Sequence, residues 1–241
     1  MILSIIIPTL NEEKVIENTL KSIKELKDCD YEIIVSDGGS KDKTIEIAKK
    51  YGVKVIVYEG SARQTIASGR NLGASIASGE FFVFLDADVT IPDINNFFRK
   101  AMNLFGSQKK LVGLTVRMKV LPELETLADR LFFALNDYNL FFSNNIFRFG
   151  SAGGEFQMIK VETFKKQKGY NEKIAVCEDI ELFQRLARGG KTRIEMSLNV
   201  LHTGRRAHAI GWPKLLSQWF INGTSVTLFK RSFNTVWEEI R

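Results

Sequence analysis

The stretch LSIIIPTLNEE at residues 3–13 joins an almost continuous apolar run to a cluster of polar side chains. A short apolar run without polar alternation is typical of a strand that is buried on both faces, as in a parallel sheet. Residues 12–27 follow, with Ile16, Leu20 and Ile23 at helical spacing. The opening therefore predicts a buried strand whose polar end leads into an amphipathic helix.

The first half of the chain repeats this unit. Runs at 31–36, 53–58 and 80–85 predict three more strands, and 42–51 and 64–77 carry helical patterns between them. Strands that alternate with helices imply right-handed βαβ units and a parallel sheet with helices on both faces. The expected fold class is therefore α/β, with a mostly parallel central sheet flanked by helices.

The pattern changes after about residue 120. The second half predicts helices at 123–144, 178–188 and 213–230, and strands at 155–160 and 192–201. No repeat, low-complexity tract or linker separates the halves. We therefore expect a single domain over residues 1–241, with a nucleotide-type half at 1–120 and a helical, aromatic-rich half at 121–241.

Composition and charge limit the partners of the chain. Its 241 residues are 44% hydrophobic and 26% charged, which is ordinary for a globular protein. The net charge of +6 favours anionic partners such as nucleotides, phosphates or acidic lipid, and no nucleic-acid reader motif is present. Two unpatterned cysteines, no secretory signal and no apolar stretch of about 18 residues predict a cytoplasmic protein without a membrane span.

Two segments suggest peripheral contact with an anionic membrane surface. Residues 130–149 are rich in Phe and Tyr, and residues 201–241 hold six Lys or Arg against two Glu, a net charge of +4. The second segment also contains Trp212, Trp219 and Trp237. Basic, aromatic-rich surfaces favour the headgroup zone of anionic bilayers. The alternative is that these aromatic side chains pack the core of the second half.

Polar residues collect where the predicted strands end. The second strand is followed by Asp37, Gly38 and Gly39, a turn in which the glycines let a ligand approach the backbone. The fourth strand is followed by Asp86 and Asp88, and residues i and i+2 of an extended segment point to the same side. Such paired carboxylates repel each other unless a cation lies between them, and hard oxygen ligands suit Mg²⁺ or Mn²⁺. Strand ends are where open parallel sheets bind ligands.

Two further positions are candidates for the site. Glu178 and Asp179 open a predicted helix, whose positive N-terminal end favours ionised carboxylates, and capping alone would also explain them. His202 ends a predicted strand, where it is either structural or a ligand.

The motifs together resemble the family 2 glycosyltransferases with a GT-A type, Rossmann-like fold. The matching stretches are SIIIPTLNEE at 4–13, VSDGGSKDKT at 35–44, GRNLGA at 69–74, GEFFVFLDADV at 79–89 and EDIELFQR at 178–185. The resemblance covers about residues 2–205. It implies an inverting enzyme that moves one sugar from a nucleotide-diphosphate donor, of UDP or GDP type, to the hydroxyl of a sugar or lipid-linked acceptor.

The resemblance also implies roles for individual residues. The donor would contact Pro8, Thr9, Asn11, Glu12, Asp37, Gly38, Arg63, Arg70, Asp86, Ala87 and Asp88. The metal, Mn²⁺ or Mg²⁺, would be held by Asp86 and Asp88, with His202 as a further metal or phosphate ligand. The acceptor or a phosphate would contact Gly153, Gly154, Glu155, Arg205 and Arg206. Asp179 would be the general base, beside Glu178. The first half would thus bind the nucleotide sugar and the second half the acceptor.

Two alternatives remain open. A sugar-phosphate nucleotidyltransferase would also use paired acids and Mg²⁺, but it would carry a basic, glycine-rich loop after the first strand, where this chain has PTLNEE. A non-catalytic nucleotide-sugar-binding protein is the other alternative. Hydrolysis of the donor, tested with and without acceptor, separates it from an enzyme.

Overall fold

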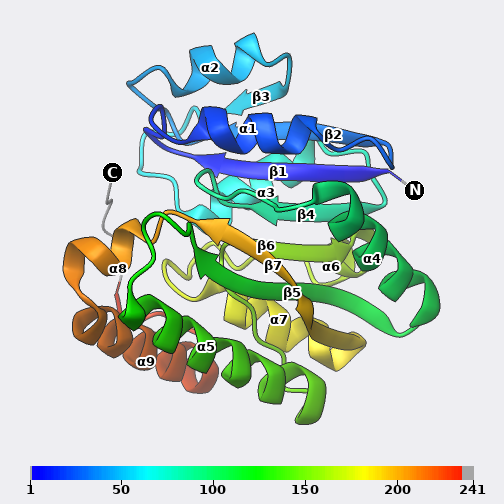
Figure 1. Cartoon of the computed structure of the whole chain (residues 1–241), viewed down its shortest axis with the longest axis vertical. Helices are drawn as coiled ribbons and strands as arrows, with labels where there is room; N and C mark the ends of the chain where they lie inside the picture. The colour runs from blue at the N-terminus through cyan, green and yellow to red at the C-terminus, as the bar shows by residue number, and fades with distance from the viewer. Residues whose placement is uncertain (1, 235–241) are drawn as a thin grey trace.

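A seven-stranded mixed sheet forms the centre of the molecule (Figure 1). The computed structural model describes residues 2–234. The strands are β1 (Leu3–Thr9), β2 (Tyr31–Asp37), β3 (Lys54–Val57), β4 (Phe81–Leu85), β5 (Leu111–Val120), β6 (Phe156–Lys160) and β7 (Lys191–His202), in the order β3-β2-β1-β4-β6-β5-β7. All pairings are parallel except those of β6, which runs antiparallel to β4 and β5. The mostly parallel α/β sheet expected from the sequence is confirmed.

Helices cover both faces of the sheet. They are α1 (Ile16–Lys24), α2 (Thr44–Lys50), α3 (Ile66–Ser75), α4 (Ile94–Ser107), α5 (Leu127–Phe141), the π-helix η1 (Phe142–Ile146), α6 (Val161–Lys166), α7 (Glu178–Gly189), α8 (Arg205–Ile210) and α9 (Trp212–Phe229). Successive side chains of a strand point to opposite faces. Ile5 and Ile7 therefore join one core with α1, α4 and α5, and Ile6 joins a second core with α3, α6 and α7.

The antiparallel direction of β6 brings the turn before it to the edge of the sheet where the parallel strands end. Since β6 runs against its neighbours, its first residues lie beside the last residues of β4, and the Asp86 backbone N–H donates to the Glu155 carbonyl. The 153–155 turn thereby reaches the edge at which β1, β2, β4 and β7 end. β5, from the first half of the chain, pairs with both β6 and β7, so the sheet continues unbroken past residue 120.

Most predicted elements are present with shorter ends, and four were not predicted. The helix expected at 123–144 begins at Leu127, behind a Thr126–Asp129 capping box, and passes into η1 at Phe142. α4, β5, α6 and α8 had no counterpart in the sequence prediction. Within residues 2–234, no helix has both the length and the apolar character needed to span a bilayer.

Candidate active site

The strand ends open into a cavity of about 1070 Å³. Most side chains predicted for the site line it: Pro8, Thr9, Glu12, Gly38, Arg63, Arg70, Asp86, Ala87, Asp88, Gly153, Gly154, Glu155, Glu178, Asp179, His202, Arg205 and Arg206. Asn11 and Asp37 do not line it. The sequence motifs, which span almost 200 positions, are thus brought together in one cavity.

Arg70 is the centre of a buried ionic cluster. It lies on the buried face of α3 and is only 1% exposed. Its guanidinium donates to Glu178 at 2.5 Å, to Asp86 at 3.1 Å and to the Gly154 carbonyl at 2.9 Å, and it lies over the Tyr170 ring. Burial alone would lower the pKa of Arg70, but Tyr170 and the surrounding carboxylates raise it well above its ordinary value. Arg70 therefore stays charged and joins α3, β4, the 153–155 turn and α7.

Three carboxyl groups near this cluster have raised pKa values. Burial and the charge of Glu178 raise the pKa of Asp179 to about 7, and burial raises that of Asp86 to about 6, although Arg70 opposes the shift. Burial and the charge of Asp86 raise the pKa of Glu155 to about 8. Burial is the largest cause of each shift and neighbouring carboxylates add to it, so a bound cation would stabilise the ionised forms.

Gly154 leaves the space between two of these carboxylates open. A methyl group added to Gly154 would lie 3.6 Å from an Asp86 carboxylate oxygen and 3.7 Å from one of Asp179. The end of β4 and the start of α7 therefore face each other across a residue without a side chain. The same point lies 3.3 Å from a guanidinium nitrogen of Arg70, so both carboxylates and the guanidinium border it.

Asp88 and the start of α8 are joined by polar contacts. The Thr203 hydroxyl donates to Asp88, and Arg205 Nε lies 3.5 Å from the same carboxylate. Arg205 also donates to both carboxylate oxygens of Glu12, at 2.6 and 2.8 Å. This paired contact connects the loop after β1 to the loop after β7 across the cavity. Within residues 2–234, no three His, Cys, Asp or Glu side chains already form a metal cage.

His202 lines the cavity and has one buried ring nitrogen without a hydrogen-bond partner among the described residues. The side chain is 8% exposed and packs edge-to-face on Phe133. Its Nδ1 accepts from the Gly204 backbone N–H at 3.2 Å, whereas its buried Nε2 has no hydrogen-bond partner among the described residues. Burial lowers the pKa of His202 and so favours the neutral ring, and a neutral ring whose Nδ1 accepts a hydrogen bond carries its proton on Nε2. In this arrangement Nε2 is a hydrogen-bond donor, which suits a phosphate oxygen better than a metal.

Asp37 is buried beneath the nucleotide side of the cavity. Its carboxylate accepts from the Thr9 hydroxyl at 2.8 Å, from the backbone N–H groups of Gly39 and Ser40, and from the Ser40 hydroxyl at 2.6 Å. A carboxylate has about four acceptor positions, and all four are used here. A nucleobase could bond to Asp37 only by displacing one of these donors, and the Ser40 hydroxyl is the one free to rotate. Asn11 braces the same loop, since its side-chain oxygen accepts from the Lys41 backbone N–H.

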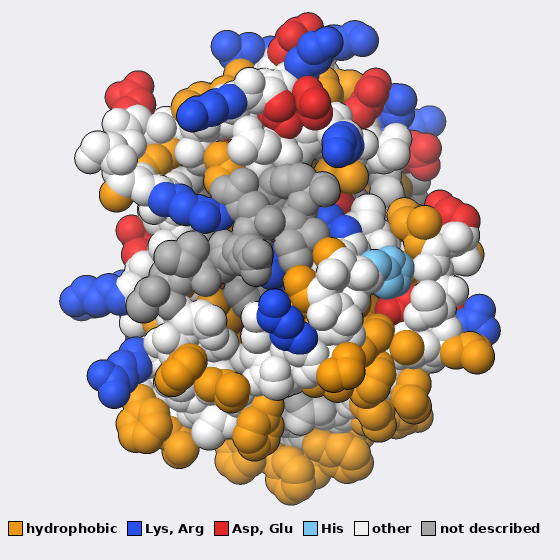
Figure 2. Space-filling view, turned by 90° about the vertical axis from the view of Figure 1, so that its left-hand side faces the viewer, with side chains coloured by type: hydrophobic (Ala, Val, Ile, Leu, Met, Phe, Trp, Pro, Cys, Tyr) orange, Lys and Arg blue, Asp and Glu red, His pale blue; other side chains and the backbone are white. Residues whose placement is uncertain are grey.

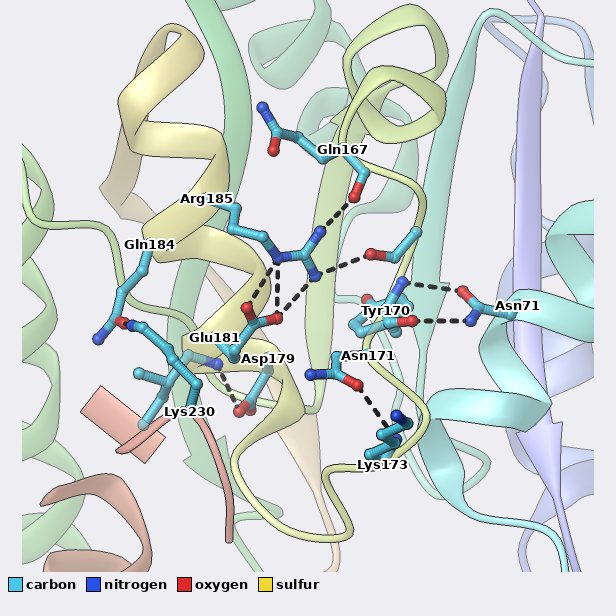
Figure 3. A network of polar contacts seen from close by, with 12 residues as sticks. Asn71, Gln167, Tyr170, Asn171, Lys173, Asp179, Glu181, Gln184, Arg185 and Lys230 are labelled. Carbon is cyan, nitrogen blue, oxygen red and sulfur yellow. Dashed lines mark hydrogen bonds and ion pairs between the residues drawn. The ribbon is translucent and has the colours of Figure 1, made fainter. Parts of the chain in front are cut away.

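The loop before α7 fixes the position of Asp179. Figure 3 shows Arg185 bound to Glu181 within α7 and to backbone carbonyls of the loop, including that of Gly169 at 2.8 Å. The Asn71 amide holds the other side of the loop through the backbone N–H and C=O groups of Tyr170. The sequence prediction missed Arg185 and Tyr170, although both lie in or near the quoted motifs.

Comparison with known proteins identifies the family. Residues 4–174 match the model of glycosyl transferase family 2, and the chain belongs to this family. Over 102 residues it is 34% identical to a PGL/p-HBAD biosynthesis glycosyltransferase of Mycobacterium bovis, a match covering 41% of this chain and 40% of the relative. Over 98 residues it is 38% identical to the 4,4'-diaponeurosporenoate glycosyltransferase of Staphylococcus haemolyticus, covering 39% of this chain and 25% of the relative.

Solved structures share the fold. The mannosyltransferase PcManGT from Pyrobaculum calidifontis, in complex with GDP-Man and Mn²⁺, superposes with a TM-score of 0.73 at 17% identity, covering 93% of this chain and 64% of that one. A glucosyl-3-phosphoglycerate synthase from Mycobacterium tuberculosis, in complex with Mn²⁺, UDP and its product, gives 0.60 at 21% identity, covering 94% and 78%. The GT-A type fold expected from the motifs is confirmed.

Proposed function

We propose that the protein is a metal-dependent, inverting glycosyltransferase that moves one sugar from a nucleotide-diphosphate donor to an acceptor hydroxyl. The observation that carries the proposal is the grouping of carboxylates around Gly154, where Asp86 and Asp179 each have an oxygen within 4 Å of the same point. A donor held at the strand ends would place its anomeric carbon between them. Structural neighbours that bind GDP-Man or UDP with Mn²⁺ support this class of donor and a divalent cofactor.

Asp86 and Asp88 are the side chains that would hold Mn²⁺ or Mg²⁺. Both carboxylates follow β4, and both line the cavity. Two protein ligands suffice for such an ion when substrate phosphates and water complete its shell. Bound there, the cation would stabilise the charge that develops on the leaving nucleoside diphosphate. His202 Nε2 would donate a hydrogen bond to a diphosphate oxygen, and Arg205 and Arg206 would add positive charge on the same side.

The nucleoside would lie between the loops after β1 and β2. Pro8, Thr9 and Glu12 line that end of the cavity together with Gly38 and Arg63. Gly38 packs against the Thr9 carbonyl, so any side chain there would narrow the space for a base. Asp37 and Asn11 shape the two loops from behind, through the hydrogen bonds described above.

Asp179 would act as the general base. The N-terminus of α7 favours a carboxylate at this position, and burial brings its pKa near neutrality, where a base is most effective. It would take the proton of the acceptor hydroxyl as that oxygen attacks the anomeric carbon from the face opposite the diphosphate. A single displacement of this kind inverts the configuration.

The Asp179→Asn variant tests the mechanism. Loss of a general base lowers the turnover rate by about 10²–10⁴-fold, while donor affinity, which depends on other residues, should stay unchanged. Near-wild-type turnover, or a product that keeps the donor's anomeric configuration, contradicts the proposal. Release of nucleoside diphosphate separates a transferase from a non-catalytic binder, and release of pyrophosphate would instead indicate a nucleotidyltransferase.

We further propose a lipid-linked acceptor and a membrane-surface location. A set of exposed apolar side chains, called the apolar surface below, lies on α5, η1, α9 and the turn after η1: Leu127, Leu131, Leu135, Tyr138, Phe142, Ile146, Phe147, Phe149, Phe220, Ile221, Leu228 and Phe229. Figure 2 shows hydrophobic side chains gathered at the lower end of the molecule, where Figure 1 places α5 and α9. Large exposed apolar patches mark membrane or partner sites.

The tryptophans expected to face the membrane do not form this surface. Trp212 is buried against Phe132 and Phe133, Trp219 packs against the core, and Trp237 lies outside the described residues. The exposed phenylalanines take that place instead.

Flotation with phosphatidylcholine vesicles, with and without phosphatidylglycerol, tests the membrane contact. The protein should float with the anionic vesicles and detach as salt rises, because salt screens the attraction of the basic residues. Leu131→Glu should weaken flotation, whereas Ile76→Glu, at an exposed position on the opposite core face, should not. Absence of salt-sensitive flotation contradicts the proposal.

A further inference from the structure

The cavity of the active site continues onto the apolar surface. Four of its lining residues, Leu135, Phe149, Phe220 and Leu228, are also more than half exposed. The same cavity reaches Asp179 and Gly154 at its inner end. The proposed base and part of the apolar surface therefore line one cavity, and an acceptor that reaches Asp179 can leave the protein through an apolar mouth.

The path between them runs between α5 and α9. We call it the α5–α9 groove and define it by Leu135 and Asn139 on α5 and by Trp219, Phe220, Gly223 and Leu228 on α9. Leu135 and Asn139 are four positions apart, as are Trp219 and Gly223, so each pair lies on one face of its helix. The helices meet where Phe132 stacks on Trp212, and α9 is anchored on its other side through Thr227 and Gln184 of α7. Both walls are thus held in place.

The lining of the groove is partly polar and partly apolar. Asn136, Asn139 and Gln184 are polar, whereas Leu135, Phe220 and Leu228, which are more than half exposed, form an apolar mouth. Polar side chains can bond the hydroxyl groups of a headgroup, whereas the mouth offers only apolar contact. The groove therefore suits an amphiphile that enters head first.

The charge around the mouth favours a lipid. Residues 196–237 contain no Asp or Glu, whereas the exposed Lys214, Lys230 and Arg231 lie on α9 or directly after it. Basic residues beside an apolar surface attract anionic headgroups, which places the mouth against the acyl region of a bilayer. A protein partner would need no apolar path to the reaction centre.

We propose that the α5–α9 groove binds the hydrocarbon chain of an amphiphilic acceptor, a lipid alcohol or glycolipid, with its hydroxyl at Asp179 and its chain leaving between Leu135 and Leu228. The inference rests on the proposed function, because it assumes that the cavity is the transfer site. It adds that chain length, and not only the headgroup, determines which acceptor binds.

Binding of terminally brominated hexanol, octanol and decanol tests the groove without turnover. Bromine quenches the fluorescence of a tryptophan that it contacts, and Trp219 lines the groove. The quenching should therefore be lost in the Trp219→Phe variant. We expect saturable quenching whose dissociation constant falls about fourfold per added CH₂, the factor that corresponds to about 0.8 kcal/mol. Quenching that does not saturate, or does not depend on chain length, overturns the inference.

A matched pair of glycine substitutions locates the binding. The nearest atom to a side chain added at Gly223 is Ile180 Cδ1 at 3.8 Å, so Gly223→Leu fills the groove without disturbing the fold. It should weaken decanol binding at least tenfold. Gly106→Leu, at a helical glycine of α4 with nothing within 4 Å, should leave binding unchanged. Equal affinities in the two variants overturn the assignment.

A second variant and a parallel measurement complete the test. Leu135→Glu, at an exposed position that tolerates charge, should also weaken decanol binding. Nucleoside-diphosphate binding in Mn²⁺ is measured on the same samples. Loss of alcohol binding with intact nucleotide binding is a failure of the groove alone. Absence of nucleotide binding is a failure of the proposed function, and the alcohol data still decide the groove.

Discussion

Replacement of Arg70 by Met should destabilise the protein more than any change at its surface. The side chain is 1% exposed, and its partners Glu178 and Asp86 lie beside it in the cavity wall. Removing one partner of a buried ion pair costs about 3–5 kcal/mol, because the remaining charge stays buried without compensation. Since a domain is stable by only about 5–15 kcal/mol, the variant should lose about a fifth of its stability or more.

Urea unfolding in chelator, at neutral pH, measures this loss. Arg193→Met is the control, since Arg193 pairs with Glu195 at a more exposed site and should cost only about 0–1 kcal/mol. The double variant Arg70→Met, Glu178→Gln should recover part of the loss, because it removes one of the stranded charges. A loss below about 1 kcal/mol in Arg70→Met, or single losses that simply add, would refute the argument that charge burial governs this cluster.

Three further predictions follow from the site. The value of kcat/KM should rise with pH to a plateau, because only the ionised carboxylate of Asp179 accepts a proton. The midpoint should lie at or below the pKa of about 7 that burial gives Asp179, since a bound cation lowers this pKa further. A profile that falls over this range would contradict the assignment, as would a midpoint that stays unchanged in Asp179→Glu although the pKa of the carboxyl group at this position has changed. Mn²⁺ should raise the melting temperature, by the equivalent of about 2.7 kcal/mol at a hundred times its dissociation constant, in the wild type but not in Asp88→Asn; equal shifts would remove Asp88 from the metal site. Asp37→Ala should weaken nucleoside-diphosphate binding by about 1–3 kcal/mol because four donors lose their acceptor and the loop loosens; unchanged affinity by calorimetry would leave Asp37 a purely structural residue.

The sheet and the place of the site were predictable because both depend on local patterns. Buried strands appear as short apolar runs, and the polar residues that follow them must meet at one edge once the strands are parallel. The missed helix α4 also had a visible pattern, with Ile94, Phe97, Phe98, Ala101 and Phe105 on its buried face. The strand β5 was harder to predict, because a glycine and two positive charges interrupt its apolar run.

The roles within the site could not be predicted from the motifs alone. Arg70 was expected to contact the nucleotide, yet its guanidinium is bonded to Glu178, Asp86 and a backbone carbonyl. Asp37 was expected to contact the base, yet its carboxylate is filled by its own loop. The partners of Arg70 come from segments up to 108 residues away, whereas three of the four donors to Asp37 belong to the turn that follows it. Both roles in nucleotide binding stay predictions.

The aromatic-rich half shows most clearly why the sequence could not decide between core and surface. A helix that is apolar on all sides is normally buried, so the residues of α5 were compatible with a packed core. In the structure Phe133 and Leu140 are buried, whereas Leu131, Leu135 and Tyr138 on the other face of the helix are exposed. Only the position of α5 at the rim of the sheet, with α9 beside it, decides which face has a protein neighbour. Leu135 belongs to both the cavity wall and the exposed face of α5. Apolar residues of α5 that are not buried in the core therefore extend the active-site cavity towards the surface.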